Sequence, residues 1–114
     1  MSDGAAADTI LVLTSLPDRE AALGLAQELV QRKLAACVNV LGAGTSVYRW
    51  QDKIETAQEL PILIKTRAAL YAEVEAAIIG CHPYELPEII AVPVMRGLPR
   101  YLEWIVAETS ISIG

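Results

Sequence analysis

The chain has 114 residues, of which 54% are hydrophobic, and its formal net charge is −5. This acidic balance, without a cluster of Lys or Arg, excludes a nucleic-acid-binding protein, which needs a basic surface. The longest uncharged stretch, residues 34–48, is interrupted by polar residues and falls short of the about 20 apolar residues that span a membrane, which excludes an inserted helix.

The first half of the chain predicts a tail, a strand and a helix. Residues 1–8 carry Asp3 and no basic segment, which is typical of a frayed tail rather than a signal peptide, and residues 9–114 form one domain. Thr9–Ser15 is β-branched and apolar, as in a central strand. Asp18 is placed to cap a helix of about four turns whose apolar residues recur at helical spacing: Ala22, Leu23, Ala26, Leu29, Val30 and Leu34.

A β-hairpin much longer than an ordinary pair of strands follows. Its first arm comprises strands Ala36–Gly42 and Thr45–Trp50, with a kink between them at residues 42–44, and its second arm is Lys53–Thr66. Because Pro61 has no N–H to donate to a ladder, we expect it at an edge or beside a bulge.

Two more helices and one strand complete the pattern. Thr66 is predicted to cap a helix that ends at Cys81 before Pro83, followed by a rigid loop, a strand and a third helix at residues 83–87, 89–95 and 98–108. Residues 110–113 alternate and predict a short edge strand. The inner face of the second helix is predicted to hold Leu70, Val74, Ala77, Ile78 and Cys81.

The order β-α-β-β-α-β predicts an α+β fold of the ferredoxin-like type, an antiparallel sheet with both main helices on one face and an extra C-terminal helix. Its other face would be bare and apolar. A domain of this size also cannot bury all its apolar residues, so topology and composition both predict an oligomer.

The sequence gives no support for an enzyme or for the familiar binding sites of this fold. A metal-carrier domain would need C-x-x-C after the first strand, where residues 14–17 read TSLP. An RNA-binding sheet would need stacking aromatic residues, and the chain has no Phe. The single histidine, His82, has no evident triad partner. Two cysteines, Cys37 and Cys81, cannot form a disulfide framework, which favours the cytoplasm.

Five segments carry a resemblance to a known family: residues 34–39 (LAACVN), 46–50 (SVYRW), 63–66 (LIKT), 82–88 (HPYELPE) and 101–104 (YLEW). In this order and spacing they closely resemble the CutA family of divalent-cation tolerance proteins, from about Thr9 to Glu108. The resemblance implies a ferredoxin-like fold in a tight homotrimer, similar in architecture to the PII signalling proteins, and a link to tolerance of metals such as copper. Relatives commonly have Gly in the turn after Trp50, where Asp52 stands here and should tolerate the left-handed conformation.

His82 is the natural candidate for a metal ligand, with Glu85 and Glu88 following it and Cys81 beside it. Imidazole and thiolate suit copper or zinc, and the resemblance points to His82 and Glu88, and less directly to Cys81. The alternative is structural: Cys81 closes the inner face of its helix and His82 bonds a backbone carbonyl. With no second histidine, we expect copper or zinc to bind weakly and with a dependence on pH.

Aromatic and charged residues near the hairpin form a second candidate site, either a cleft between subunits or a packing interface: Tyr48, Trp50, Glu59, Lys65 and Tyr84. Two functions therefore stay open. One is a trimeric protein that binds or responds to divalent metals, and the other is a PII-like signalling or anchoring module that holds a small ligand or a partner protein.

Overall fold

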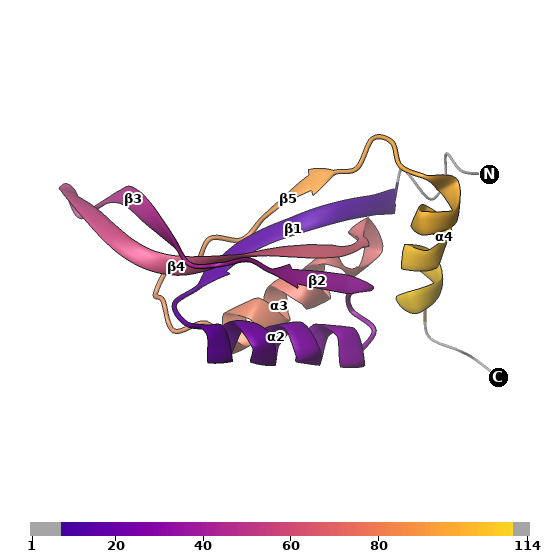
Figure 1. Cartoon of the computed structure of the whole chain (residues 1–114), viewed down its shortest axis with the longest axis horizontal. Helices are drawn as coiled ribbons and strands as arrows, with labels where there is room; N and C mark the ends of the chain where they lie inside the picture. Colours follow the sequence, from indigo (N-terminus) through magenta and orange to yellow (C-terminus); the bar gives the residue numbers. More distant parts are fainter. Residues whose placement is uncertain (1–7, 111–114) are drawn as a thin grey trace.

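The computed structural model describes residues 8–110 and contains one antiparallel sheet with helices on one of its faces (Figure 1). Strands β1 (Thr9–Leu16), β2 (Cys37–Val40), β4 (Lys53–Arg67) and β5 (Ile90–Pro93) lie in the order β2-β4-β1-β5. Strand β3 (Gly44–Trp50) pairs with the first half of β4. With α2 (Arg19–Gln31) and α3 (Tyr71–Cys81), this is the predicted ferredoxin-like order.

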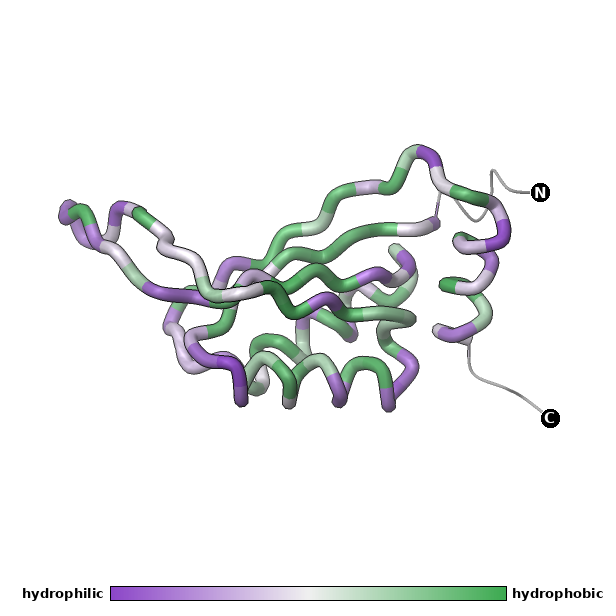
Figure 2. The backbone as a smooth tube through the Cα atoms, in the orientation of Figure 1, coloured by the Kyte–Doolittle hydropathy of each residue, from purple (hydrophilic) through white to green (hydrophobic). Residues whose placement is uncertain are grey.

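The core lies between the sheet and these two helices. Alternate residues of β1 and β4 face the helices, and because Val12 is paired with Ile64, their side chains are fully buried side by side. Ala22, Leu25 and Leu29 of α2 complete the contact. Figure 2 shows the apolar residues concentrated along these central strands.

Helix α2 begins where the sequence predicted and presents a slightly different face. The Asp18 carboxylate accepts a hydrogen bond from Ala21 N at 2.8 Å, which confirms the cap. Leu25 is buried, whereas Leu23 and Val30, which were predicted to be inside, are exposed. The helix ends in a Schellman motif, with Lys33 at φ 60° where glycine is usual.

The prediction that Thr66 caps the second helix is wrong. Strand β4 runs on to Arg67, and a 3-10 turn (Ala68–Leu70) separates it from α3. Thr66 is fully buried and its hydroxyl donates to the carbonyl oxygen of Leu34 at 2.7 Å, so a tertiary partner replaced the local one. Cys81 was predicted to lie on the inner face of α3, and it is exposed.

The hairpin projects beyond the sheet as a two-stranded ribbon, at the left of Figure 1. The molecule measures 49 × 28 × 23 Å, and its radius of gyration of 15.1 Å exceeds the about 13 Å of a compact chain of this length. Gln51 and Asp52 both have positive φ, as a tight two-residue turn requires, so the turn forms without glycine. Pro61 is not at an edge, since it is paired with Ser15 inside the continuous ladder between β4 and β1. On its other side it lies at the break between β2 and β3, where Leu41 N donates to its carbonyl oxygen.

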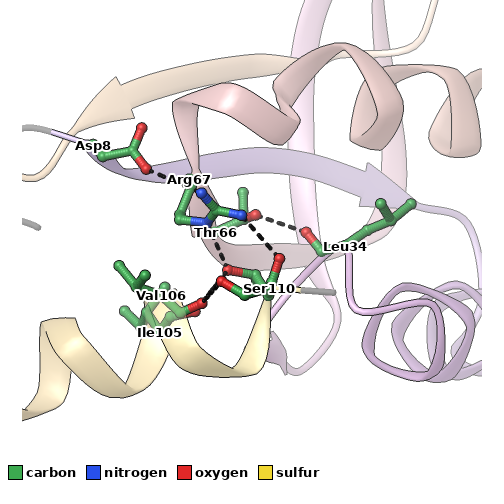
Figure 3. A network of polar contacts seen from close by, with 8 residues as sticks. Asp8, Leu34, Thr66, Arg67, Ile105, Val106 and Ser110 are labelled. Carbon is green, nitrogen blue, oxygen red and sulfur yellow. Dashed lines mark hydrogen bonds and ion pairs between the residues drawn. The ribbon is translucent and has the colours of Figure 1, made fainter. Parts of the chain in front are cut away.

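Helix α4 (Pro99–Glu108) closes the end of the sheet where β1 starts and β4 ends, and Pro99 stands in its first turn as predicted. Its Leu102 and Ile105 pack with Ala36 and Val94. Arg67 of β4 donates to the hydroxyl and the carbonyl oxygen of Thr109 at 2.8 and 2.9 Å. Figure 3 shows the Arg67 side chain directed toward the end of α4 at Ser110. This cation satisfies one carbonyl group at the negative end of the helix.

The face of the sheet opposite α2 and α3 is largely uncovered and apolar. We call it the open face, and its central residues are paired across the strands: Leu11, Leu13, Leu63, Ile90 and Val92. Ile90 and Val92 are 51% and 43% exposed, which confirms the predicted bare face. In residues 8–110, no helix is long and apolar enough to cross a membrane. The strand predicted at residues 110–113 and most of the tail predicted at residues 1–8 lie outside the described residues.

Candidate functional site

A cleft of about 900 Å³ lies between the projecting hairpin and the loop at residues 82–88. Five of the residues selected from the sequence line it together: Tyr48, Trp50, Glu59, Tyr84 and Glu88. Ser15, Ser46 and Glu85 also line it and were not selected as cleft residues. Ser46 could be identified only from the strand register, which pairs it with Ala57 across the hairpin.

The register of the hairpin explains why a hollow exists here. On the face of the hairpin toward the cleft, Gly44 is paired with Glu59 and Ser46 with Ala57. Gly44, Ser46 and Ala57 are small, and Tyr48 and Trp50 follow on the same face toward the tip, because side chains alternate along a strand. Because these small residues lie next to large aromatic ones, an open volume is left beside the small residues.

Tyr84 joins the loop to the hairpin across this space. Burial raises the pKa of Tyr84, and so do its hydrogen bond to Glu59 and the charge of that carboxylate. The Tyr84 ring also lies 4.7 Å from the ring of His82, centroid to centroid. This ring contact lies within the loop and packs its two aromatic side chains together.

His82 ties the loop to the sheet with both of its ring nitrogens. Its Nδ1 accepts a hydrogen bond from Tyr84 N at 3.1 Å, so the ring proton lies on Nε2, which donates to the carbonyl oxygen of Ser15 at 2.6 Å. The structural interpretation of His82, that it bonds a backbone carbonyl, is confirmed. Neither nitrogen has a free lone pair for a metal ion in this arrangement.

Three selected residues are not among those that line the cleft: His82, Cys81 and Lys65. Cys81 as a whole residue is exposed at the end of α3. Its sulfur is partly buried, and this burial, followed by the charge of Glu28, raises the pKa of the thiol. Lys65 is six residues beyond Glu59 on the same face of β4, about 20 Å along the strand. Its ammonium instead lies 3.4 Å from the Tyr101 hydroxyl and 5.7 Å from the centre of that ring.

The residues of one chain do not fit a chelating copper or zinc centre. Within residues 8–110 no three His, Cys, Asp or Glu side chains are grouped so that they could share an ion. The thiol of Cys81 is in addition held in its protonated form by the raised pKa, whereas a metal needs the thiolate. What the cleft does offer is carboxylates and aromatic rings around an open volume.

Comparisons with known proteins agree with this fold. The family model described as "CutA1 divalent ion tolerance protein" matches residues 10–108. The divalent-cation tolerance protein CutA of Thermus thermophilus is 40% identical over 95 residues, which cover 83% of this chain and 92% of that protein. The chloroplastic CutA of Arabidopsis thaliana is 41% identical over 85% of this chain, which spans 53% of the plant protein.

Solved structures give the same result. The crystal structure of CutA from Xylella fastidiosa is 47% identical, with a TM-score of 0.87 over 90% of this chain and 99% of that one. The periplasmic divalent cation tolerance protein CutA of Archaeoglobus fulgidus is 36% identical, with the same TM-score and the same coverage. The matched family model covers most of the residues and the fold is shared throughout, so the chain belongs to the CutA family of divalent-cation tolerance proteins.

Proposed function

We propose that this chain contributes to divalent-cation tolerance as a non-catalytic homotrimer, arranged like the PII proteins, with its clefts next to the interfaces between subunits. The family supports the link to divalent cations. The observation that supports a trimer is the apolar open face, together with the exposed hairpin.

An isolated two-stranded ribbon is marginally stable in water, and this one exposes large apolar side chains. Val47 and Ile54 are 66% and 71% exposed on the face of the hairpin away from the cleft. Patches of this kind are rare on monomers and mark interaction surfaces. A ring of three copies covers every hairpin with a neighbour and leaves none open, which is a closed arrangement.

Assembly is tested by Trp50→Ala, because aromatic residues anchor interfaces when they are buried there. The variant should dissociate, and with that lose the circular dichroism of the folded chain, at a higher protein concentration than the parent. Trp104→Ala, on α4, is the matched control for losing an indole. Equal dissociation of parent and Trp50→Ala would show that Trp50 is no anchor.

We propose that copper or zinc binds weakly and depends on His82, with Glu88 and Cys81 as the secondary ligands. An incoming ion would have to displace the N–H of Tyr84 from Nδ1, or the carbonyl oxygen of Ser15 from Nε2, which costs a hydrogen bond. Titration calorimetry with copper(II) or zinc chloride tests this on a chain without residues 1–7, because a free amino terminus can itself bind copper. Binding should strengthen as pH rises and protons stop competing for the imidazole.

The matched variants are His82→Gln, which should abolish most of the binding, and Glu88→Ala, which should cost less because a carboxylate is a poorer ligand for these metals. Binding that is unchanged in His82→Gln would show that the loop does not contact the metal.

The two free cysteines support a reducing compartment, and we propose the cytoplasm. Because relatives are named chloroplastic and periplasmic, cell fractionation decides this location.

A second candidate function is a PII-like regulatory or anchoring module that holds a small ligand in the cleft. The observation that favours it is the cleft itself, whose volume falls within the range of small-molecule sites. Ligand binding in the cleft without metal binding at His82 would favour this function over the first.

A further inference from the structure

We infer that the cleft binds a small organic cation, an ammonium or guanidinium group on a short apolar stem. The inference rests on the second candidate function, since it names the class of ligand for that cleft. Four features of the described residues support it: charge, aromatic faces, an open carboxylate and apolar lining.

The charge of the cleft has one sign. Glu59, Glu85 and Glu88 line it, and no Lys, Arg or His is among its lining residues in the described part of the chain. The whole chain is also acidic, with a formal net charge of −5 that includes these three glutamates. Acidic walls around a hollow raise the local concentration of cations and exclude anions.

The aromatic residues favour an organic cation over a metal ion. Tyr48, Trp50 and Tyr84 lie along the same hollow, and the faces of such rings attract ammonium and guanidinium groups. The carboxylates do not converge into a group of three ligands within residues 8–110, as a bound metal ion would require. Pro83 and Leu86 of the loop provide apolar surface for a hydrocarbon stem.

Glu59 is the carboxylate best placed to hold the charge. It is half-buried in β4, and its partner across the hairpin is Gly44, which has no side chain to cover it. A Cβ built on Gly44 meets no atom within 4 Å, so the space beside Glu59 is open. Tyr84 lines the same cleft from the loop, so the Glu59 carboxylate lies between the open space at Gly44 and an aromatic ring.

The two tryptophans of the chain allow a direct test on the full protein. The indole N–H signal of Trp50 in ¹H–¹⁵N spectra reports on the cleft, and that of Trp104, on α4, serves as the internal control. The probes are n-butylammonium and tetramethylammonium chloride, with n-butanol and sodium butyrate as the neutral and anionic controls. Both cations should shift the Trp50 signal and leave the Trp104 signal in place.

Three variants sharpen the result. Glu59→Gln should weaken n-butylammonium at least about fivefold, because a charge-assisted contact becomes a neutral one. Glu73→Gln removes the same charge on α3 and should change little. Gly44→Val fills the open space without changing charge and should also weaken both cations, while the backbone, which has no positive φ there, accepts the side chain.

Other outcomes overturn the inference in distinguishable ways. Equal shifts with n-butanol or butyrate would leave a ligand cleft but refute its selectivity for cations. Zinc chloride that displaces n-butylammonium from Trp50 would indicate a metal site. A Trp50 signal that moves on dilution and ignores the cations would mean that a neighbouring copy fills the cleft. Sedimentation of the same samples measures the mass of the assembly and shows separately whether the protein is a trimer.

Discussion

The role of His82 can be tested by replacing one half of its ring at a time. In His82→Gln the side-chain amide reaches the position of Nε2 and can still donate to Ser15 O, but the acceptor for Tyr84 N is lost. In His82→Asn the side-chain oxygen replaces Nδ1, so the bond from Tyr84 N stays and the bond to Ser15 is lost. His82→Ala loses both.

The magnitudes follow from these contacts. A neutral hydrogen bond contributes about 0.5–1.5 kcal/mol to the free energy of unfolding, and an acceptor left unpaired adds to the cost. The bond to Ser15 is part-buried and short at 2.6 Å, whereas the bond from Tyr84 is exposed and longer at 3.1 Å. We therefore expect stability to fall in the order parent, Gln, Asn, Ala, with His82→Ala lower than the parent by about 2–3 kcal/mol.

Urea unfolding followed by circular dichroism measures this series. Every variant is compared at one protein concentration, because the stability of an oligomer depends on concentration. With a slope of about 1–3 kcal/mol per molar, the midpoint of His82→Ala should fall by roughly 1 M. A His82→Ala protein that unfolds at the midpoint of the parent would refute the anchoring role and return the imidazole to metal binding.

Three further predictions concern single side chains. The pKa of Tyr84 is raised by burial and then by Glu59, so the unfolded chain loses the phenol proton first and stability should fall as pH rises through about 10. Glu59→Gln should lower the pKa of Tyr84, which is measured from phenolate absorbance with Tyr84→Phe as the blank. Lys33→Gly should raise the free energy of unfolding by about 0.5–1 kcal/mol, because glycine adopts φ 60° without strain; a lower midpoint would contradict the Schellman geometry. Gly97→Ala should lower the free energy of unfolding by about 1–3 kcal/mol, since the new Cβ would lie 2.9 Å from the buried Leu102. Gly80→Ala, with open space around its Cβ, should not lower it.

Local signals predicted most of the elements. The Asp18 cap, Pro99 in the first turn of α4 and the two-residue turn at Gln51 are short-range features, and short-range chemistry determines them. Thr66 shows where this reasoning fails. It has the side chain of a helix cap, but the extension of β4 and a hydrogen bond to Leu34, far away in sequence, place it in the core.

The candidate site was predictable in composition and only partly in geometry. Tyr48 and Trp50 of the hairpin and Tyr84 of the loop line one cleft, although Tyr84 is distant from the other two in sequence. Lys65 does not join Glu59, because two residues on one strand face lie as far apart as the strand requires. One of the two hydrogen bonds of His82 is made to Ser15 of β1, 67 residues earlier, and no pattern near the loop predicts that contact.

The central claim is that the open face and the hairpin are buried against two other copies, and the mass of the assembly in solution tests it most directly. Sedimentation equilibrium should give about three times the chain mass of 12.3 kDa at micromolar concentration, with loss of circular dichroism once dilution breaks the assembly. A species of 12.3 kDa that keeps its folded spectrum on dilution would contradict the account.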